Sequence, residues 1–331
     1  MRAYTRRLSL AVLSIALSCI AAPAMAQGKV DMAIFHPERN AWTAPLKWWI
    51  EEVEKVTQGR VKFTPHFAGS LVTVVETLKA VRDGSVPAGY TAASFVSGQM
   101  PYMAYLEALG GVPAETDKLI EVLNALRPVL EGEMRKSGVE YLWAQGSGSL
   151  IYFCRDRHLR TAADYKNRKI RTAGRWQAEQ LRALGASPVA TDPSEQYIAL
   201  QNRTIDCAVS INLVGPGFKL HEVAPKVTQT RVPVNLSFYI MNKGLYDKIS
   251  EADRAAIRRL SIEADKRSAE HVAKIEIESI ALMNSQKAEM YYLNAAEYAE
   301  LRKAIAPTFT KMDSEGGEAG KRIADIVKRY W

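Results

Sequence analysis

The sequence predicts an α/β fold, and three observations lead to this prediction. Strand and helix patterns alternate from about residue 30, and the alternation resumes between residues 138 and 211. Such alternation favours a sheet with parallel strand pairs that is covered by helices. The third observation is the stretch from Ser250 to Met290, which contains no glycine or proline and follows a helical pattern.

Two strand–helix units are predicted at the start of the fold. Residues 30–35 show the alternation of a strand, and apolar residues over 46–56 recur at helical spacing. The stretch 61–67 predicts a second strand, and the apolar spacing over 74–81 predicts a second helix. The sequences "TQGR" and "DGS" stop the two helices.

The middle of the chain repeats this rhythm. The glycine-rich sequence "QGSGS" at 145–149 matches no phosphate-binding motif and is interpreted as a flexible loop. The predicted strands lie at 138–144, 149–154, 168–173 and 205–211, and the predicted helices lie at 176–186 and 193–203.

The helical stretch after Ser250 is unusually long. Ser250 and Asp253 resemble a capping box. About forty residues at 1.5 Å per residue would measure roughly 60 Å, more than the width of one small domain. Two arrangements remain open: two helices in series, or one helix that spans two lobes with a ligand-binding cleft between them. The apolar positions are Ile257, Leu260, Ala264, Val272, Ile275 and Leu282.

Residues 1–26 have the pattern of a cleavable signal peptide. The basic start "MRAYTRR" precedes the apolar run "LSLAVLSIALSCIAA", which is too short to span a bilayer comfortably. Ala24 and Ala26 then form a small-x-small pattern before a cleavage site. Because no later segment has about 18 consecutive apolar residues, we expect an exported protein that is not embedded in the membrane.

Export changes the charge and the cysteine count. The chain has 44 basic and 36 acidic side chains, a net charge of +8, and loss of Arg2, Arg6 and Arg7 leaves 41 against 36, or +5. This mild surplus suits anions and argues against nucleic acid as a partner. Cys154 and Cys207 remain, and in an oxidising compartment they either pair or lie buried as separate thiols.

The sequence shows no motif for catalysis or metal binding. A nucleophile elbow, a P-loop and a dinucleotide-binding fingerprint are all missing. The histidines have no second ligand at metal spacing, so we expect no metal and no cofactor. These histidines are His36, His66, His158, His221 and His271. An exported α/β protein without a nucleophile–base pair is better interpreted as a binding protein than as an enzyme.

Several motifs resemble the solute-binding proteins of TRAP transporters. They are "DYKNRKIR" at 164–171, "ALGASP" at 183–188, "EQYIALQ" at 195–201 and "IDC" at 205–207. The stretches 56–85 and 239–257 are also similar to family segments. The resemblance therefore covers most of the mature chain, in one order.

This resemblance implies a type II periplasmic binding protein fold, with two α/β lobes joined by crossover strands and a long spanning helix. Residues 27–150 and about 236–275 are then assigned to the N-terminal lobe, and 151–235 and about 276–331 to the C-terminal lobe. The family implies an organic acid as ligand and the membrane permease subunits of a TRAP transporter as partners. We therefore expect a periplasmic monomer.

The resemblance also implies that Arg171, the arginine of the sequence "KIR", binds the ligand. The planar guanidinium matches a carboxylate with two parallel hydrogen bonds, and its charge does not titrate near neutral pH. The alternative interpretation is a structural ion pair at the end of a strand.

Other positions depart from the best-known family members. Where the sialic-acid receptors and several dicarboxylate receptors have a second arginine, this chain has Ile151. This chain has Ala92 where the sialic-acid receptors have a glutamate. It has Ser210 in place of a family asparagine, with Asn212 close by. One arginine suits one carboxylate, so the sequence predicts a monocarboxylate rather than a four-carbon dicarboxylate or sialic acid.

Further residues are predicted to contact the ligand. Arg175 and Trp176 lie at the start of a helix whose N-terminal amides favour an anion. Residues at the ends of N-terminal strands predict an aromatic wall, which suits an aromatic acid. The remaining candidates are Phe35, His36 and Tyr90 in this wall, and Asn235 near the second crossover.

Two other functions stay open at this stage. The same fold and site would serve a receptor that reports its ligand to a sensor kinase, and permease genes beside this one would distinguish transport from sensing. A periplasmic enzyme on the same scaffold is the other alternative, and turnover of a bound ligand would reveal it.

Overall fold

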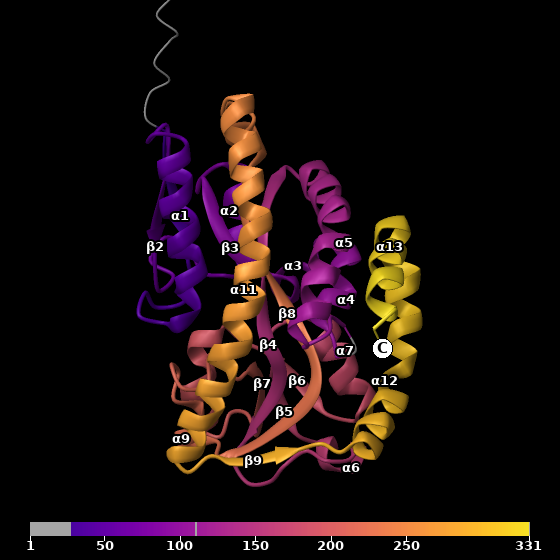
Figure 1. Ribbon diagram of the computed structural model, residues 1–331. Coiled ribbons are helices and arrows are strands. Elements are labelled where there is room, and N and C mark those ends of the chain that lie inside the picture. Colours follow the sequence, from indigo (N-terminus) through magenta and orange to yellow (C-terminus); the bar gives the residue numbers. More distant parts are fainter. Residues whose placement is uncertain (1–27, 110, 331) are drawn as a thin grey trace, which may run out of the picture.

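One mixed sheet runs through both halves of the molecule (Figure 1). This computed structural model describes residues 28–109 and 111–330, so the predicted signal peptide lies outside the described residues. Within them, the sheet has nine strands: eight follow the order β2-β1-β3-β8-β4-β7-β5-β6, and β9 pairs with β8 outside this order. The strands are β1 Gly28–Ala33, β2 Val61–His66, β3 Ala88–Ala92, β4 Val139–Cys154, β5 Lys169–Thr172, β6 Ser187–Ala190, β7 Cys207–Ile211, β8 Lys226–Asn242 and β9 Glu289–Tyr292.

The predicted parallel pairs are confirmed at both ends of the sheet. Strand β1 runs parallel to β2 and β3, and β5 runs parallel to β6 and β7. The two long strands β4 and β8 connect these ends and pair antiparallel with each other. The C-terminal part of β8 pairs with β3, and its N-terminal part pairs with β9. Both strands therefore cross from one lobe to the other, as the α/β two-lobe prediction requires.

Strand β4 corrects one prediction. The sequence "QGSGS" is not a loop between two strands, because it lies inside the single strand β4. The pairing with β8 shifts register between Gly146 and Ser149, and Gly148 has a φ of 76°, which side chains other than glycine rarely adopt. The glycines thus let one strand continue through an irregular stretch.

The long helix α11, Glu251–Ser285, is one unbroken helix that spans the molecule (Figure 1). Its 35 residues measure about 50 Å at 1.5 Å per residue. The Oγ atom of Ser250 accepts a hydrogen bond of 3.1 Å from the amide of Asp253, which caps the first turn as predicted. The predicted apolar face is wrong at Leu282, which is exposed, because the neighbouring Met283 is the residue that packs inside.

Helix α11 is fastened to β4 on both sides of the glycine-rich stretch. In the first half of the helix, the buried Asp265 pairs with Arg127 and accepts a 2.7 Å hydrogen bond from the amide of Ala144. In the second half, Glu276 accepts a 3.0 Å hydrogen bond from the amide of Ser149. The helix and the crossover strand therefore behave as one support that both lobes share.

The other helices cover the sheet, and α12 and α13 return to pack beside α7 and α5 (Figure 1). The helix predicted at 193–203 is a 3₁₀ turn, Pro193–Glu195, followed by α8. The lobe boundaries near residues 150, 235 and 275 remain predictions. The helices are α1 Ala44–Val56, α2 Thr77–Asp83, α3 Ala93–Val96, α4 Ala104–Glu107, α5 Thr116–Lys136, α6 Ala162–Tyr165, α7 Arg175–Ala183, α8 Gln196–Gln201, α9 Leu220–Val223, α10 Lys243–Tyr246, α12 Ala295–Glu315 and α13 Gly317–Lys328, with further 3₁₀ turns at Ala41–Thr43 and Pro101–Met103.

Cys154 and Cys207 form a disulfide, which decides between the two alternatives that the sequence left open. They lie opposite each other on the neighbouring strands β4 and β7, with 4.2 Å between their Cα atoms. The bond closes a loop of 53 residues that contains β5, β6, α7 and α8.

Replacing both cysteines with alanine (C154A/C207A) should lower the free energy of unfolding by about 2–4 kcal/mol, because the bond restricts the unfolded chain. Denaturant unfolding of the mature protein measures this. A reducing agent should bring the wild type to the stability of the variant and leave the variant unchanged. Two free thiols in the unfolded, unreduced wild type would contradict the bond.

Candidate functional site

A cavity lies beside the glycine-rich stretch of β4, where the two halves of the molecule meet. The empty space between its lining atoms, open solvent at the mouth included, is about 470 Å³, and the centres of water-sized spheres reach about 60 Å³ of it. The walls come from both lobes and from both crossover strands. Prominent lining residues are Phe35, Trp42 and Tyr90 from the N-terminal part, Ser147 and Asn235 from β4 and β8, and Arg171, Gln177, Gln196 and Ser210 from the C-terminal part.

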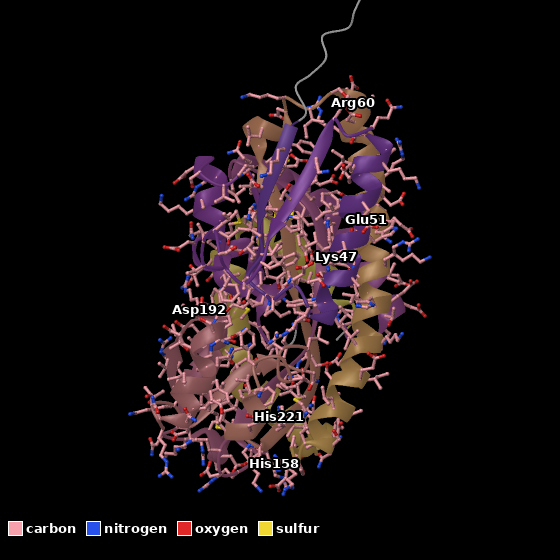
Figure 2. All side chains as sticks on the ribbon, turned by 90° about the vertical axis from the view of Figure 1, so that its left-hand side faces the viewer. Lys47, Glu51, Arg60, His158, Asp192 and His221 are labelled. Atoms are coloured by element: carbon pink, nitrogen blue, oxygen red, sulfur yellow. A yellow bond between two sulfur atoms is a disulfide. The ribbon has the colours of Figure 1, made fainter. Side chains whose placement is uncertain are left out.

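Arg171 projects into this cavity from β5, and backbone carbonyls fix its guanidinium. Nε and Nη2 both donate to the carbonyl oxygen of Thr191, at 3.1 and 2.9 Å, and Nη1 donates to that of Val209 at 3.0 Å. Asp192 is the neighbour of Thr191 in the sequence. Figure 2 shows it where the N-terminal part of the chain, in indigo, meets the middle part of the chain, in pink. These bonds use three of the five guanidinium N–H groups. One N–H on each terminal nitrogen remains for another acceptor.

The charge of Arg171 has no carboxylate partner among the described residues. The residue is only 3% exposed, yet it forms no salt bridge within 4.0 Å of any of them. Burial lowers the pKa of the guanidinium to about 10, and the negative charge of Asp192 opposes this shift. Arg171 is therefore still charged at neutral pH. A buried cation of this kind is stabilised when a carboxylate reaches it.

Part of the cavity wall is aromatic. The rings of Phe35, Trp42 and Tyr90 pack together, with centroids 5.1 to 6.2 Å apart. His36 lies behind them and does not line the cavity, which differs from the prediction. Burial lowers the pKa of His36 to about 4, so the ring is neutral near neutral pH and behaves as part of the aromatic packing.

The crossover strand β4 faces the cavity with Leu150 rather than with Ile151. Successive side chains of a strand point to opposite faces, and Ile151 belongs to a separate apolar core. Ala92, by contrast, lines the cavity. Both cavity-lining positions are apolar. Arg171 is therefore the sole charged side chain among the described residues of the lining.

Arg175 and Trp176 do not line the cavity, in contrast to the prediction. The guanidinium of Arg175 points to α12, where Nη1 lies 2.7 Å from a carboxylate oxygen of Glu315. It also lies over the Trp176 ring, 4.8 Å from the ring centroid. Trp176 is fully buried in the N-terminal core. These two residues of the first turn of α7 therefore pack against other parts of the protein, whereas the next residue, Gln177, lines the cavity.

Of the three polar candidates, Ser210 and Asn235 line the cavity and Asn212 does not. Asn212 is buried and its amide exchanges two hydrogen bonds with that of Gln229, at 2.9 and 2.7 Å. It donates a further 2.9 Å bond to Glu276 on α11. The Asn212 amide therefore hydrogen-bonds to other side chains of the protein, and it links strand β7 to the long helix α11.

Several lining residues were not predicted from the sequence, among them Trp42, Gln177 and Gln196. Gln196 is part of the "EQYIALQ" motif at 195–201, so the sequence does carry a signal at this position. Gln177 directly follows the two residues that were selected. Trp42 sits in a short 3₁₀ turn, Ala41–Thr43, that follows β1 and carries no strand or helix periodicity.

A buried carboxyl group, Glu107, holds the first turn of α7 in place. Its Oε1 accepts hydrogen bonds of 2.8 and 3.1 Å from the amides of Trp176 and Gln177, and Ser97 bonds the other oxygen. Burial raises the pKa of Glu107 to about 8, although these hydrogen bonds limit the rise. Only glycine fits at position 174, because a Cβ there would lie 2.2 Å from Glu107 Oε1.

The described residues contain no group of three or more His, Cys, Asp or Glu side chains that is arranged to hold a metal ion. In the same part of the chain, the helices are all too short or too polar to cross a membrane.

A family model matches most of the chain. The model of the bacterial extracellular solute-binding proteins, family 7, covers residues 32–315. Among relatives, the ectoine-binding periplasmic protein TeaA of Halomonas elongata is 24% identical over 249 residues, which are 72% of this chain and 70% of that protein. This similarity extends across both predicted lobes.

Solved structures share the same two-lobe fold. A TRAP periplasmic solute-binding protein of Desulfovibrio salexigens with bound orotic acid has a TM-score of 0.85 and 19% identity, covering 91% of this chain and 97% of that one. A Bordetella pertussis extracytoplasmic solute receptor that binds pyroglutamic acid has a TM-score of 0.82 and 18% identity, covering 90% and 99%. The architecture is therefore a periplasmic binding protein fold.

The Glu107 carboxyl group should make the stability of the protein depend on pH. Its pKa in the folded protein, about 8, lies above the ordinary value near 4.5. Its contribution to the free energy of unfolding is therefore complete below pH 4.5 and is lost as pH rises to 8. Relative to Glu107→Gln, the wild type should lose stability over this window, by at most about 1.4 kcal/mol per pH unit. Denaturant unfolding at several pH values measures the difference.

The exposed Glu300→Gln variant is the matched control, since its stability should follow that of the wild type at every pH. Parallel pH profiles for the wild type and Glu107→Gln would contradict a neutral, buried Glu107.

Proposed function

The chain belongs to family 7 of the bacterial extracellular solute-binding proteins, and from this premise we propose that it is the periplasmic receptor of a TRAP-type secondary transporter. It binds an organic acid in the cavity at Arg171 and delivers it to the membrane permease subunits. The family match over residues 32–315 and the two-lobe fold support the receptor role. The signal-peptide pattern of residues 1–26 supports export to the periplasm.

The observation that carries the ligand assignment is the buried charge of Arg171, which no carboxylate among the described residues pairs with. Two free N–H groups on its terminal nitrogens suit a carboxylate, which accepts two parallel hydrogen bonds from a guanidinium. The carbonyls of Thr191 and Val209 hold the group in place before the ligand arrives. Little side-chain freedom is then lost on binding, which favours affinity.

The rest of the cavity supports a ligand with one carboxylate and a compact apolar body. A second carboxylate would meet Leu150 and Ala92, and it would lose its hydration without gaining a cation. Four-carbon dicarboxylates and sialic acid therefore fit poorly, and aromatic or other ring monocarboxylates fit the wall of Phe35, Trp42 and Tyr90. Orotic acid and pyroglutamic acid, the ligands of two structural relatives, are small ring acids of this kind.

Binding without turnover is part of the proposal. No histidine or cysteine is found among the described residues that line the cavity, and its hydroxyl groups have no neighbouring base there. Such a lining offers no activated nucleophile. We also propose that the receptor acts as a monomer and without a cofactor.

A thermal-shift screen of carboxylic acids tests the ligand class. Ring monocarboxylates such as orotate, benzoate and pyroglutamate should raise the melting temperature of the mature protein more than succinate or malate does. The reason is the single cation in an otherwise neutral lining. The largest shift for a four-carbon dicarboxylate would contradict the single-carboxylate proposal.

Replacing Arg171 with methionine should weaken binding of the best acid by at least about 100-fold, because the ligand carboxylate would be buried without a cation. Titration calorimetry measures the loss. The matched control is Arg175→Met, which removes an arginine four residues away that pairs with Glu315 and should retain wild-type affinity. Unchanged affinity in Arg171→Met would remove this residue from the site.

A further inference from the structure

Two side-chain oxygens of residues that line the cavity have no hydrogen-bond donor among the described residues. They are Oε1 of Gln196 on α8 and Oδ1 of Asn235 on β8, and both are buried away from water. Gln196 is 1% exposed and Asn235 is 9% exposed. The amide nitrogen of Gln196 donates to the carbonyl oxygen of Pro193 at 3.2 Å, which fixes the orientation of this amide and leaves the oxygen as the free atom.

Unsatisfied buried oxygens are rare in folded proteins, and each costs about 1–3 kcal/mol. Both belong to residues that line the cavity, as Arg171 does. The lining residues therefore offer donors from Arg171 and from Trp42, whose Nε1 has no acceptor among the described residues, and acceptors from Gln196 and Asn235. A bare hydrocarbon acid would pair with the arginine and leave both oxygens without a partner.

The charge balance of the cavity limits what kind of donor can bind. Arg171 and the ligand carboxylate together sum to zero, and the described lining contains no carboxylate. An ammonium group on the ligand would add a second buried positive charge without a counterion, which is strongly unfavourable. A neutral N–H group, as in a lactam or an imide, donates the same hydrogen bond without adding charge.

We propose that the ligand is a small ring acid with a neutral N–H donor, and that Gln196 and Asn235 recognise this donor and determine specificity. This inference rests on the proposed function, because it assumes that Arg171 holds the carboxylate. It goes beyond that function because it names the second recognition element and excludes both simple hydrocarbon acids and amino acids with a free ammonium group.

Four ring acids of similar size test the proposal by titration calorimetry on the mature protein. Pyroglutamate has a neutral N–H, N-methylpyroglutamate and cyclopentanecarboxylate have no donor, and proline has a charged one. Pyroglutamate should bind about 10- to 100-fold more tightly than each of the others, which is the cost of one buried acceptor left unpaired.

Gln196→Met keeps the length of the side chain and removes its oxygen, and Asn235→Leu does the same on β8. Each should bring the affinities for pyroglutamate and N-methylpyroglutamate closer together. Gln201→Met, an exposed position on the same helix as Gln196, is the control and should keep the full preference.

Two failures are distinguishable. If the N-methyl and hydrocarbon acids bind as tightly as pyroglutamate and Arg171→Met abolishes all of this binding, the donor proposal is wrong and the proposed function stands. If Arg171→Met leaves the binding of every acid unchanged, or if no acid in the wider screen binds, both proposals fall. A preference for pyroglutamate that persists in both Gln196→Met and Asn235→Leu also overturns the specificity role.

Discussion

The cavity is organised around one buried positive charge that the described protein residues do not neutralise. Arg171 is held by the carbonyl oxygens of Thr191 and Val209, so its position is fixed by backbone and not by a carboxylate. Backbone carbonyls orient the guanidinium but carry only partial charge, and they leave its net charge for a ligand to balance. The rest of the described lining, Leu150 and Ala92 included, carries no charged side chain.

A ligand bound at this charge must be contacted by both lobes, and the elements that both lobes share hold the two walls of the cavity together. Strands β4 and β8 each contribute to the sheet of both lobes, and α11 is fastened to β4 by Asp265 in one half and by Glu276 in the other. The ladder between β4 and β8 is irregular at Gly146–Ser149, beside the cavity. Backbone hydrogen bonds resist bending least where the ladder is interrupted, so a change in cavity width is most easily absorbed there.

How much the sequence predicts depends on the range of the interactions involved. Periodicity located most of the strands and helices, and the motif around Arg171 identified the residue that lies in the cavity with free N–H groups. Contacts between distant segments were not predictable: Arg175 is drawn away by Glu315, 140 residues later, and Asn212 is bound by Glu276. The face of a strand to which a side chain points was also not predictable from the sequence. Leu150 lines the cavity, whereas Ile151, the next residue of the same strand, lies in the core.

The surroundings of the cavity keep its charge constant over the middle of the pH range. His36 has a pKa of about 4 and Glu107 one of about 8, both because of burial, so both are predominantly neutral between about pH 5 and 7. The guanidinium, with a pKa of about 10, is charged throughout. The protonation state of the ligand is then what varies. A carboxylic acid pairs with Arg171 only when ionised, and protonation below its own pKa removes the charge that the cavity is built to receive.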